Sequence, residues 1–293
     1  MPTSSPAISR LVPVMLVTLA LPHSAAAQQV TGSFERTLTV TGKPELDVRS
    51  GSGSIEVRSG PAGRVEVRGR VSAGDWNVFR SGPSAQDRVR RIEAAPPIEQ
   101  AGNRITIGRI DDDDLKNVSV SYVVTVPAET ALVSKTGSGS HVIEGVHGDI
   151  TASSGSGSIR VRDAAGEVRT STGSGSILVE TVAGSVSANS GSGSIHLSGL
   201  RGSVRASTSS GTLRVQGEPT GEWRLGSSSG SVTVEFAGMP AFALDAHSSS
   251  GRIETDYPVT VNGITSRHEL RGVVNGGGPL LHVRTSSGGI HIR

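Results

Sequence analysis

Cysteine is absent from this chain of 293 residues, so disulfide bonds, thiolate nucleophiles and cysteine zinc sites are excluded. Aromatic residues make up only 3% of the sequence, too few for a core of bulky rings. The 28 lysines and arginines nearly balance the 26 acidic residues, and no basic cluster accompanies stacking aromatics, which argues against a nucleic-acid partner. After the N-terminal region, no apolar run is long enough to cross a membrane.

The N-terminal segment, residues 1–27, has the parts of a secretory signal peptide. Arg10 gives a positive start, an apolar run follows over residues 11–22, and alanines at 25–27 suit cleavage. The run is short for a membrane span, and an uncleaved anchor is the alternative. We therefore expect export to the periplasm, the cell surface or the extracellular space, with no transmembrane span after signal removal.

One short string, Gly-Ser-Gly-Ser-Ile, dominates the rest of the chain, in intact copies such as residues 155–159 and in worn ones. In nine copies the residue seven positions before its second glycine is apolar, and the residue two positions after that glycine is apolar in all but one, where His141 stands. A fixed period of about 18 residues predicts a stacked array of repeats. The second glycines that keep this period are Gly139, Gly157, Gly175, Gly193 and Gly211.

Within each repeat, apolar and polar residues alternate, which is typical of β-strands. Two short strands and two turns fill one period, and one such coil can bury its apolar face only against its neighbours. We therefore predict an all-β fold, a parallel β-solenoid of the β-helix or β-roll kind with coils of about 18 residues. We expect the inward serines and threonines to form hydrogen-bonded ladders.

Residues 28–293 are predicted to form a single adhesin-like β-solenoid domain, with an irregular β insertion at about 71–131. The insertion could be degenerate coils or a protruding arm. Phe34 and Leu38 are the candidates for the cap that the N-terminal end of a solenoid needs. Beyond residue 257, a longer excursion could cover the end or a side of the stack before the last coil at 281–293.

Two charged clusters stand out in the insertion. Arg88, Arg90 and Arg91 form the densest basic cluster, interpreted as a solvated strand face. The run from Asp111 to Asp114 could offer oxygen ligands to a divalent cation, but a solvated turn is the preferred interpretation. We expect no cofactor and no metal.

The order of these features resembles the bacterial putative-adhesin family, the β-strand-repeat proteins of unknown function found in cell envelopes. The similarity covers about residues 34–293 and implies a β-solenoid-like fold in an envelope or surface setting, with no catalytic residues to transfer. In that family the fourth motif position is often Asp, whereas here it is Ser in every Gly-Ser-Gly-Ser-Ile copy. The residues that carry the resemblance are Leu46-Asp47-Val48-Arg49, Val118 to Pro127 followed by alanine, the serial coils, and the closing segment from Leu281 to Ile290.

The preferred function is that of an exported, non-enzymatic envelope or surface protein that presents an elongated β surface to a partner. Outward arginines favour envelope glycans or surface proteins as that partner. A structural or regulatory role in envelope stress is an alternative. The candidate surface-binding residues are Arg160, Arg169, Arg205 and Arg214.

An enzyme that acts on polysaccharides is the other alternative, because exported β-helices often carry such sites. That chemistry needs paired carboxylates or a metal beside a base, and outward acids such as Glu144 and Glu180 are scattered. His141 is interpreted as a satisfied core residue, and His282 and His291 are expected to face solvent. A calcium-binding β-roll is excluded for the coils, since Ser, Thr or Arg stands where carboxylate ligands are needed.

Overall fold

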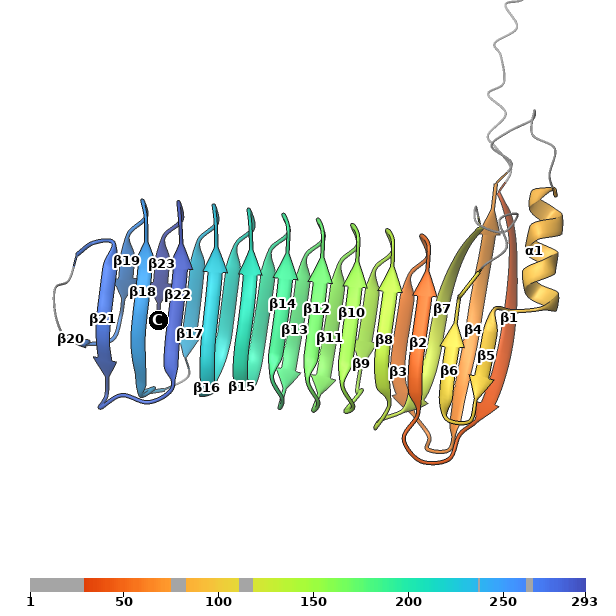
Figure 1. Ribbon diagram of the computed structural model, residues 1–293, viewed down its shortest axis with the longest axis horizontal. Helices are drawn as coiled ribbons and strands as arrows, with labels where there is room; N and C mark the ends of the chain where they lie inside the picture. Colours follow the sequence, from red (N-terminus) through yellow and green to blue (C-terminus); the bar gives the residue numbers. More distant parts are fainter. Residues whose placement is uncertain (1–28, 75–82, 111–117, 237, 262–265) are drawn as a thin grey trace, which may run out of the picture.

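The computed structural model describes residues 29–74, 83–110, 118–236, 238–261 and 266–293. In these residues the chain is almost wholly β, with one helix, α1 (Ala85–Ala94), at one end of an elongated molecule (Figure 1). The strands form a long, mostly parallel sheet folded into two facing rows. The predicted all-β class is therefore confirmed. The predicted signal peptide and the run from Asp111 to Asp114 lie outside the described residues.

The first strands of successive repeats form one row, which we call row A. In spatial order it comprises β6 (Arg104–Ile107), β2 (Glu45–Ser50), β8 (Ala131–Thr136), β10 (Ile150–Ser154), β12 (Val168–Thr172), β14 (Val186–Ser190), the later parts of β15 (Ile195–Thr208) and β16 (Leu213–Ser227), β22 (Leu280–Thr285) and β18 (Phe242–Ser248).

The second strands form the facing row, row B. It comprises β7 (Val118–Pro127), β3 (Ile55–Gly60), β9 (His141–Glu144), β11 (Ile159–Ala164), β13 (Ile177–Val182), the earlier parts of β15 and β16, β17 (Val232–Phe236), β23 (Ile290–Ile292) and β19 (Ile253–Thr255).

The core lies between the two rows and is built from the apolar positions of the repeat. Ile150 pairs in parallel with Val168, its counterpart in the next repeat, and Val168 pairs with Val186. All three side chains are at most 2% exposed, as are Ile159 and Ile177 from row B. Each such burial contributes roughly 1.5–3 kcal/mol. The residues between them, including alanines and threonines, are small and inward, as the sequence predicts.

The turn between the two strands of a repeat is held by a hydroxyl ladder. Ser154 Oγ donates to the Gly139 carbonyl of the preceding repeat at 3.0 Å and accepts from the Gly157 N–H at 2.8 Å. The predicted ladder is thus confirmed. The glycine itself is imposed by stacking, because a Cβ on Gly157 would lie 1.9 Å from the Gly139 oxygen. Equivalent bridges form at Ser50, Thr136, Thr172, Ser190, Thr208, Ser227, Ser248 and Thr285.

At the C-terminal end, the order of strands in space departs from the order in sequence. The row A strand that comes last in the sequence, β22, lies in space between β16 and β18. In row B, β23 lies between β17 and β19. The chain therefore runs out to β18 and β19, returns through β20 (Thr260–Val261) and β21 (Glu269–Val274), and places its final strands inside the stack. The excursion covers the end, where β21 pairs antiparallel with β18. The sequence register predicts the last coil but not its place.

The N-terminal end is closed by antiparallel strands and by α1. The strand β1 (Val30–Thr39) pairs with β4 (Arg64–Ala73), which pairs with β7, while β5 (Ile98–Ala101) flanks β6. Phe34 is 7% exposed and meets the Tyr122 ring edge to face at 6.3 Å. The predicted cap is confirmed at Phe34, and Leu38 is partly buried against the core.

The interpretation of the arginine cluster as a strand face is wrong, because Arg88, Arg90 and Arg91 lie on α1. Ser84 caps this helix by accepting a hydrogen bond from the Asp87 N–H. Alanine, valine and isoleucine side chains at helical spacing bury one face against β1 and β4, and Arg88 lies on that face with 8% exposure. Alternation over a few positions could not reveal this helical period. The helix is too short to span a bilayer.

Candidate functional site

The four arginines singled out in the sequence do not converge on one patch. Arg169 and Arg205 lie on row A, whereas Arg160 and Arg214 lie on row B. Because the rows enclose the core between them, their outward faces point in opposite directions. One partner therefore cannot contact all four side chains on a single flat face.

The outward face of row B neutralises much of its own charge. Glu144 lies between Arg58 and Arg162, at 3.8 Å from each, and Arg162 also pairs with Glu180. Further along, Arg214 Nε lies 3.8 Å from Glu235. Surface pairs of this kind contribute little stability, but they leave row B without a concentrated field of one sign.

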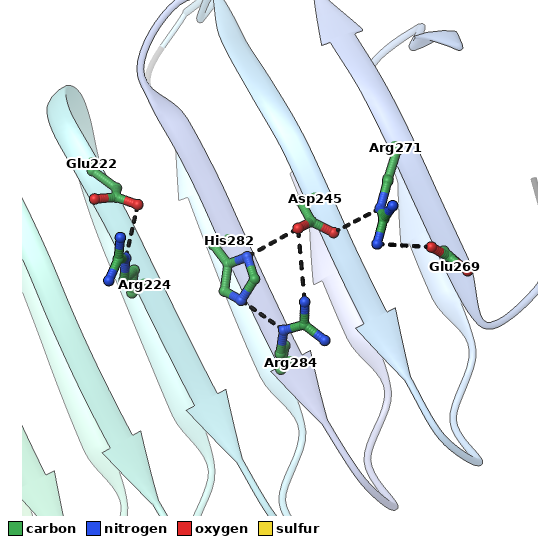
Figure 2. Close-up of polar contacts among 7 residues, drawn as sticks. All are labelled: Glu222, Arg224, Asp245, Glu269, Arg271, His282 and Arg284. Atoms are coloured by element: carbon green, nitrogen blue, oxygen red, sulfur yellow. Dashed lines mark hydrogen bonds and ion pairs between the residues drawn. The ribbon is translucent and has the colours of Figure 1, made fainter. Parts of the chain in front are cut away.

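The outward face of row A carries a denser set of polar groups near its C-terminal end. In register, Arg205 pairs with Arg224, Arg224 with His282, and His282 with Asp245. Figure 2 shows the side chains of this region, which project from β16, β22, β18 and β21. They come together only because β22 is inserted between β16 and β18.

Hydrogen bonds fix the orientation of these groups (Figure 2). Asp245 accepts from His282 Nδ1 at 3.1 Å and from Arg271 Nε at 3.2 Å. Arg284 Nε donates to His282 Nε2 at 2.7 Å, and Arg224 Nε donates to a carboxylate oxygen of Glu222 at 2.7 Å. Both nitrogens of His282 are thus engaged, and its role in this arrangement is to hold Arg284.

Arg224 and Arg284 are each held through Nε and keep 53% of their side chains exposed. Within the described residues, Arg224 makes no further hydrogen bond, and the only other charged contact of Arg284 is at 3.8 Å to Asp245. Both terminal nitrogens of Arg224 therefore remain available to a ligand, as does Nη1 of Arg284, whereas Nη2 of Arg284 faces Asp245. Guanidinium groups in this state suit carboxylate and phosphate oxygens.

Beside these arginines lies a shallow groove, which we call the Gly226 groove. Two adjoining hollows of about 400 and 260 Å³ share Ser207, Gly226 and Arg284 in their walls. The walls also include Arg224, His282, His247 and several turn serines, but no aspartate or glutamate. The groove crosses β14, β15, β16, β22 and β18, with its floor at Gly226.

Within the described residues, no three histidine, aspartate or glutamate side chains are grouped so that they could hold a metal ion. His141 is an inward residue at 1% exposure, contacting Ser134 Oγ at 2.7 Å and the Ser153 carbonyl at 2.9 Å. Burial lowers the pKa of His141. The interpretation of His141 as a satisfied core residue is confirmed.

The other two histidines are outward but not freely solvated. His282 keeps 25% of its side chain exposed against Asp245, and His291 keeps 34% and pairs with Glu254 at 3.2 Å. Each meets a carboxylate from the strand that lies beside it in space. The expectation that both histidines face outward is confirmed, but it did not include their contacts with carboxylates of the neighbouring strands.

Sequence reasoning missed Arg224, Gly226 and Arg284. The register already placed them at outward positions, since Trp223 and Leu281 occupy the inward slot before them. What the register could not show is that β22 follows β16 in space, because the strands from β17 to β21 all come between them in the sequence. In addition, nothing in the sequence distinguishes Gly226, which leaves an outward strand position without a side chain, from the other glycines among the 39 of the chain.

The protein is thus elongated and all-β, and one of its outward faces carries a shallow groove lined mostly by polar residues. The family model described as Toastrack DUF4097 matches residues 116–293, and the chain belongs to this family. This confirms the resemblance to the β-strand-repeat proteins of unknown function. A comparison with curated proteins finds no match.

Several solved structures share remote similarity with the chain. A putative adhesin from Bacteroides fragilis is 12% identical, with 89% of this chain and 97% of that one covered and a TM-score of 0.48. A putative adhesin from Parabacteroides distasonis is 10% identical, with 89% and 97% covered and a TM-score of 0.38. A putative lipid binding protein from the same species is 12% identical, with 89% and 96% covered and a TM-score of 0.39. Likeness at this level supports no conclusion about what this chain binds.

Proposed function

We propose that this protein is an exported, non-enzymatic envelope or surface protein that uses the outward face of row A to bind a partner. The observation that carries the proposal is the Gly226 groove, an open hollow flanked by half-exposed arginines and free of acidic walls. Such a surface holds a ligand by many shallow contacts. The apolar run and alanines of residues 1–27 support export.

The scaffold of this function is a β-solenoid with coils of about 18 residues. Parallel pairing between equivalent positions of successive repeats, as in Ile159 with Ile177 and Ile177 with Ile195, supports this architecture. In a solenoid each coil contacts only its neighbours, and the outward side chains form straight lines along the stack. This geometry therefore provides an elongated face for binding.

An enzymatic role is less well supported than binding. The best candidate for a base, His282, has its Nε2 occupied by Arg284 and its Nδ1 by Asp245. Hydrolysis of a glycosidic bond also needs two carboxyl groups that face each other across the substrate, and the groove walls contain none. We therefore assign the groove to binding.

The proposal is tested by localisation and by retention on the envelope. The full chain should be found in the exported fraction of its native cell, and the purified protein should be retained by envelope preparations. The double variant Arg224→Glu/Arg284→Glu on row A should lose this retention. The matched double variant Arg160→Glu/Arg214→Glu on row B should keep it.

Two results would contradict the proposal. Retention of the wild-type protein inside the cytoplasm would overturn the envelope setting. Equal loss of envelope retention in the row A and row B variants would show general charge attraction rather than a binding face.

A further inference from the structure

We propose that the Gly226 groove is the binding site for an acidic polysaccharide, a chain whose sugars carry carboxylate or other anionic groups. This inference rests on the proposed surface-binding function and names the class of ligand that row A takes. It commits to a glycan chain because the groove is long, shallow, hydroxyl-lined and basic. Each of these properties is visible in the residues of its walls.

Charge selects an anionic ligand. Arg224 and Arg284 are the only residues among lysine, arginine, aspartate and glutamate in the groove walls, and about half of each side chain is exposed. Glu222 and Asp245 hold these arginines from outside the walls. Arg205 extends the basic line onto β15, next to Arg224 in register. Arg224, whose two terminal nitrogens make no contact in the described residues, can bind a carboxylate through paired hydrogen bonds, and Nη1 of Arg284 can donate one more.

The hydroxyl groups select a sugar. The groove reaches the turns of four neighbouring repeats, where Ser209, Ser228, Ser249 and Ser286 form its edge, and Ser207 lies in its wall. Hydroxyls both donate and accept hydrogen bonds, as sugar hydroxyls do. The walls contain no Phe, Tyr or Trp for stacking. Binding must therefore depend on charge and hydrogen bonds, and should weaken steeply with salt.

The dimensions select a chain over a single sugar. The groove crosses five adjacent strands, and strands lie about 4.8 Å apart, so its floor extends for roughly 19 Å. The strands that it crosses belong to the straight stack seen in Figure 1. A polymer can enter such a groove from the side without threading an end.

Gly226 is a glycine that the fold itself does not require. Its φ is not in the left-handed region, and a Cβ there would meet only the Ser207 Cβ at 3.9 Å, an ordinary contact. By contrast, a Cβ on Gly230 would lie 1.9 Å from the Gly211 carbonyl oxygen. A glycine inside a strand lowers stability and often marks the close approach of a ligand. The missing side chain is what opens the groove.

The test measures binding of the full-length protein to polygalacturonate, a carboxylated polysaccharide, at low ionic strength. Uncharged dextran serves as the neutral polymer. Gly226→Leu should raise the Kd by about tenfold or more, because its side chain occupies the floor of the groove. Ser171→Leu is the matched control: it places the same side chain at the equivalent outward position, on β12, three strands away and outside the groove.

A second pair of variants keeps the test independent of the folding of Gly226→Leu. Arg224→Gln and Arg284→Gln should each weaken polygalacturonate binding several-fold, whereas Arg169→Gln on the same face should leave it unchanged. Melting temperatures from circular dichroism verify that all variants are folded.

Equal binding of dextran and polygalacturonate, no binding of polygalacturonate, or unaltered binding by folded Gly226→Leu together with both arginine variants would overturn the inference. A protein that adheres to envelopes through row A but ignores polygalacturonate would contradict the ligand class and leave the proposed function standing. A protein that binds polygalacturonate through the groove but never leaves the cytoplasm would contradict the proposed function alone.

Discussion

At the scale of single residues, the position of a hydroxyl decides whether it is structural. Thr172 and Ser171 are neighbours on β12, yet Thr172 Oγ1 bridges two buried backbone groups while Ser171 points outward. Thr172→Val should cost about 1–3 kcal/mol of unfolding free energy, because the Gly157 carbonyl and the Gly175 N–H lose their partner. Urea unfolding measures the loss.

Ser171→Ala is the control for this prediction and should change the unfolding free energy by less than about 0.5 kcal/mol. Thr172→Ser should retain most of the stability, since it keeps the hydroxyl. Equal stability of Thr172→Val and the wild-type protein would show that the ladder does not support the turns.

His141 makes stability depend on pH. Burial lowers its pKa in the folded protein, so the unfolded chain binds the extra proton first as the pH falls. The free energy of unfolding is therefore at its full value above the histidine pKa of the unfolded chain, about 6.5. It decreases as the pH falls from there through the folded pKa, with a limiting slope of about 1.4 kcal/mol per pH unit. Unfolding free energies between pH 8 and pH 4 measure this slope.

The neighbouring repeat supplies a matched replacement for this histidine. Ile159 and Ala152 occupy the positions that His141 and Ser134 hold one repeat earlier. The double variant His141→Ile/Ser134→Ala should therefore fold and show a shallower loss of stability in acid. An unchanged slope would assign the pH dependence to other groups.

At the scale of elements, the final strands β22 and β23 hold the C-terminal end together. They supply both pairing partners that β18 and β19 have on the inner side. Removal of residues 279–293 should leave residues 238–278 without a row to join, while the strands from β8 to β14 keep their neighbours. Limited proteolysis should therefore cleave the region 238–278 first and spare the repeats between residues 131 and 208.

Equally fast cleavage of residues 238–278 in the full-length protein and in the truncated one would contradict this prediction. The sensitivity of this region to protease would then not depend on β22 and β23. The single change Ile290→Ala offers a milder version. It should destabilise the same end by about 2–5 kcal/mol, as the loss of a buried isoleucine does.

Much of the element scale could be predicted from the sequence. Positions such as Ile150 and Ile159 identify the inward faces because the period is regular and each repeat has the same local environment. The helix α1 was missed because its apolar residues occupy barely three turns within a segment flanked by strands. The groove was missed because strand order depends on contacts between distant segments, and no local pattern places β22 beside β16.

At the scale of the whole molecule, the repeat length is a quantity that can be tested by deletion. Removal of residues 155–172 takes out one complete period and joins Ser154 to Gly173, which occupies the position of Gly155 in the next repeat. This variant should fold, with a maximum dimension shorter by about 4.8 Å in solution scattering. Its stability should fall by the contribution of one coil.

Removal of residues 155–171 is the matched control. It deletes one residue fewer, so every following side chain would change from the inward to the outward face. This variant should fail to give a cooperative unfolding transition. Equal folding of the two deletions would overturn the proposed coil length.

The inserted position of β22 and β23 also sets the order of events during synthesis. A ribosome makes the chain from its N-terminus, so the strands from β8 to β14 can pair with their neighbours while later residues are still being added. The strands β18 and β19 must wait, because their partners on the inner side, β22 and β23, follow them in the sequence and are made later. This end of the stack, and the groove that crosses it, can be completed only after β22 and β23 have been made.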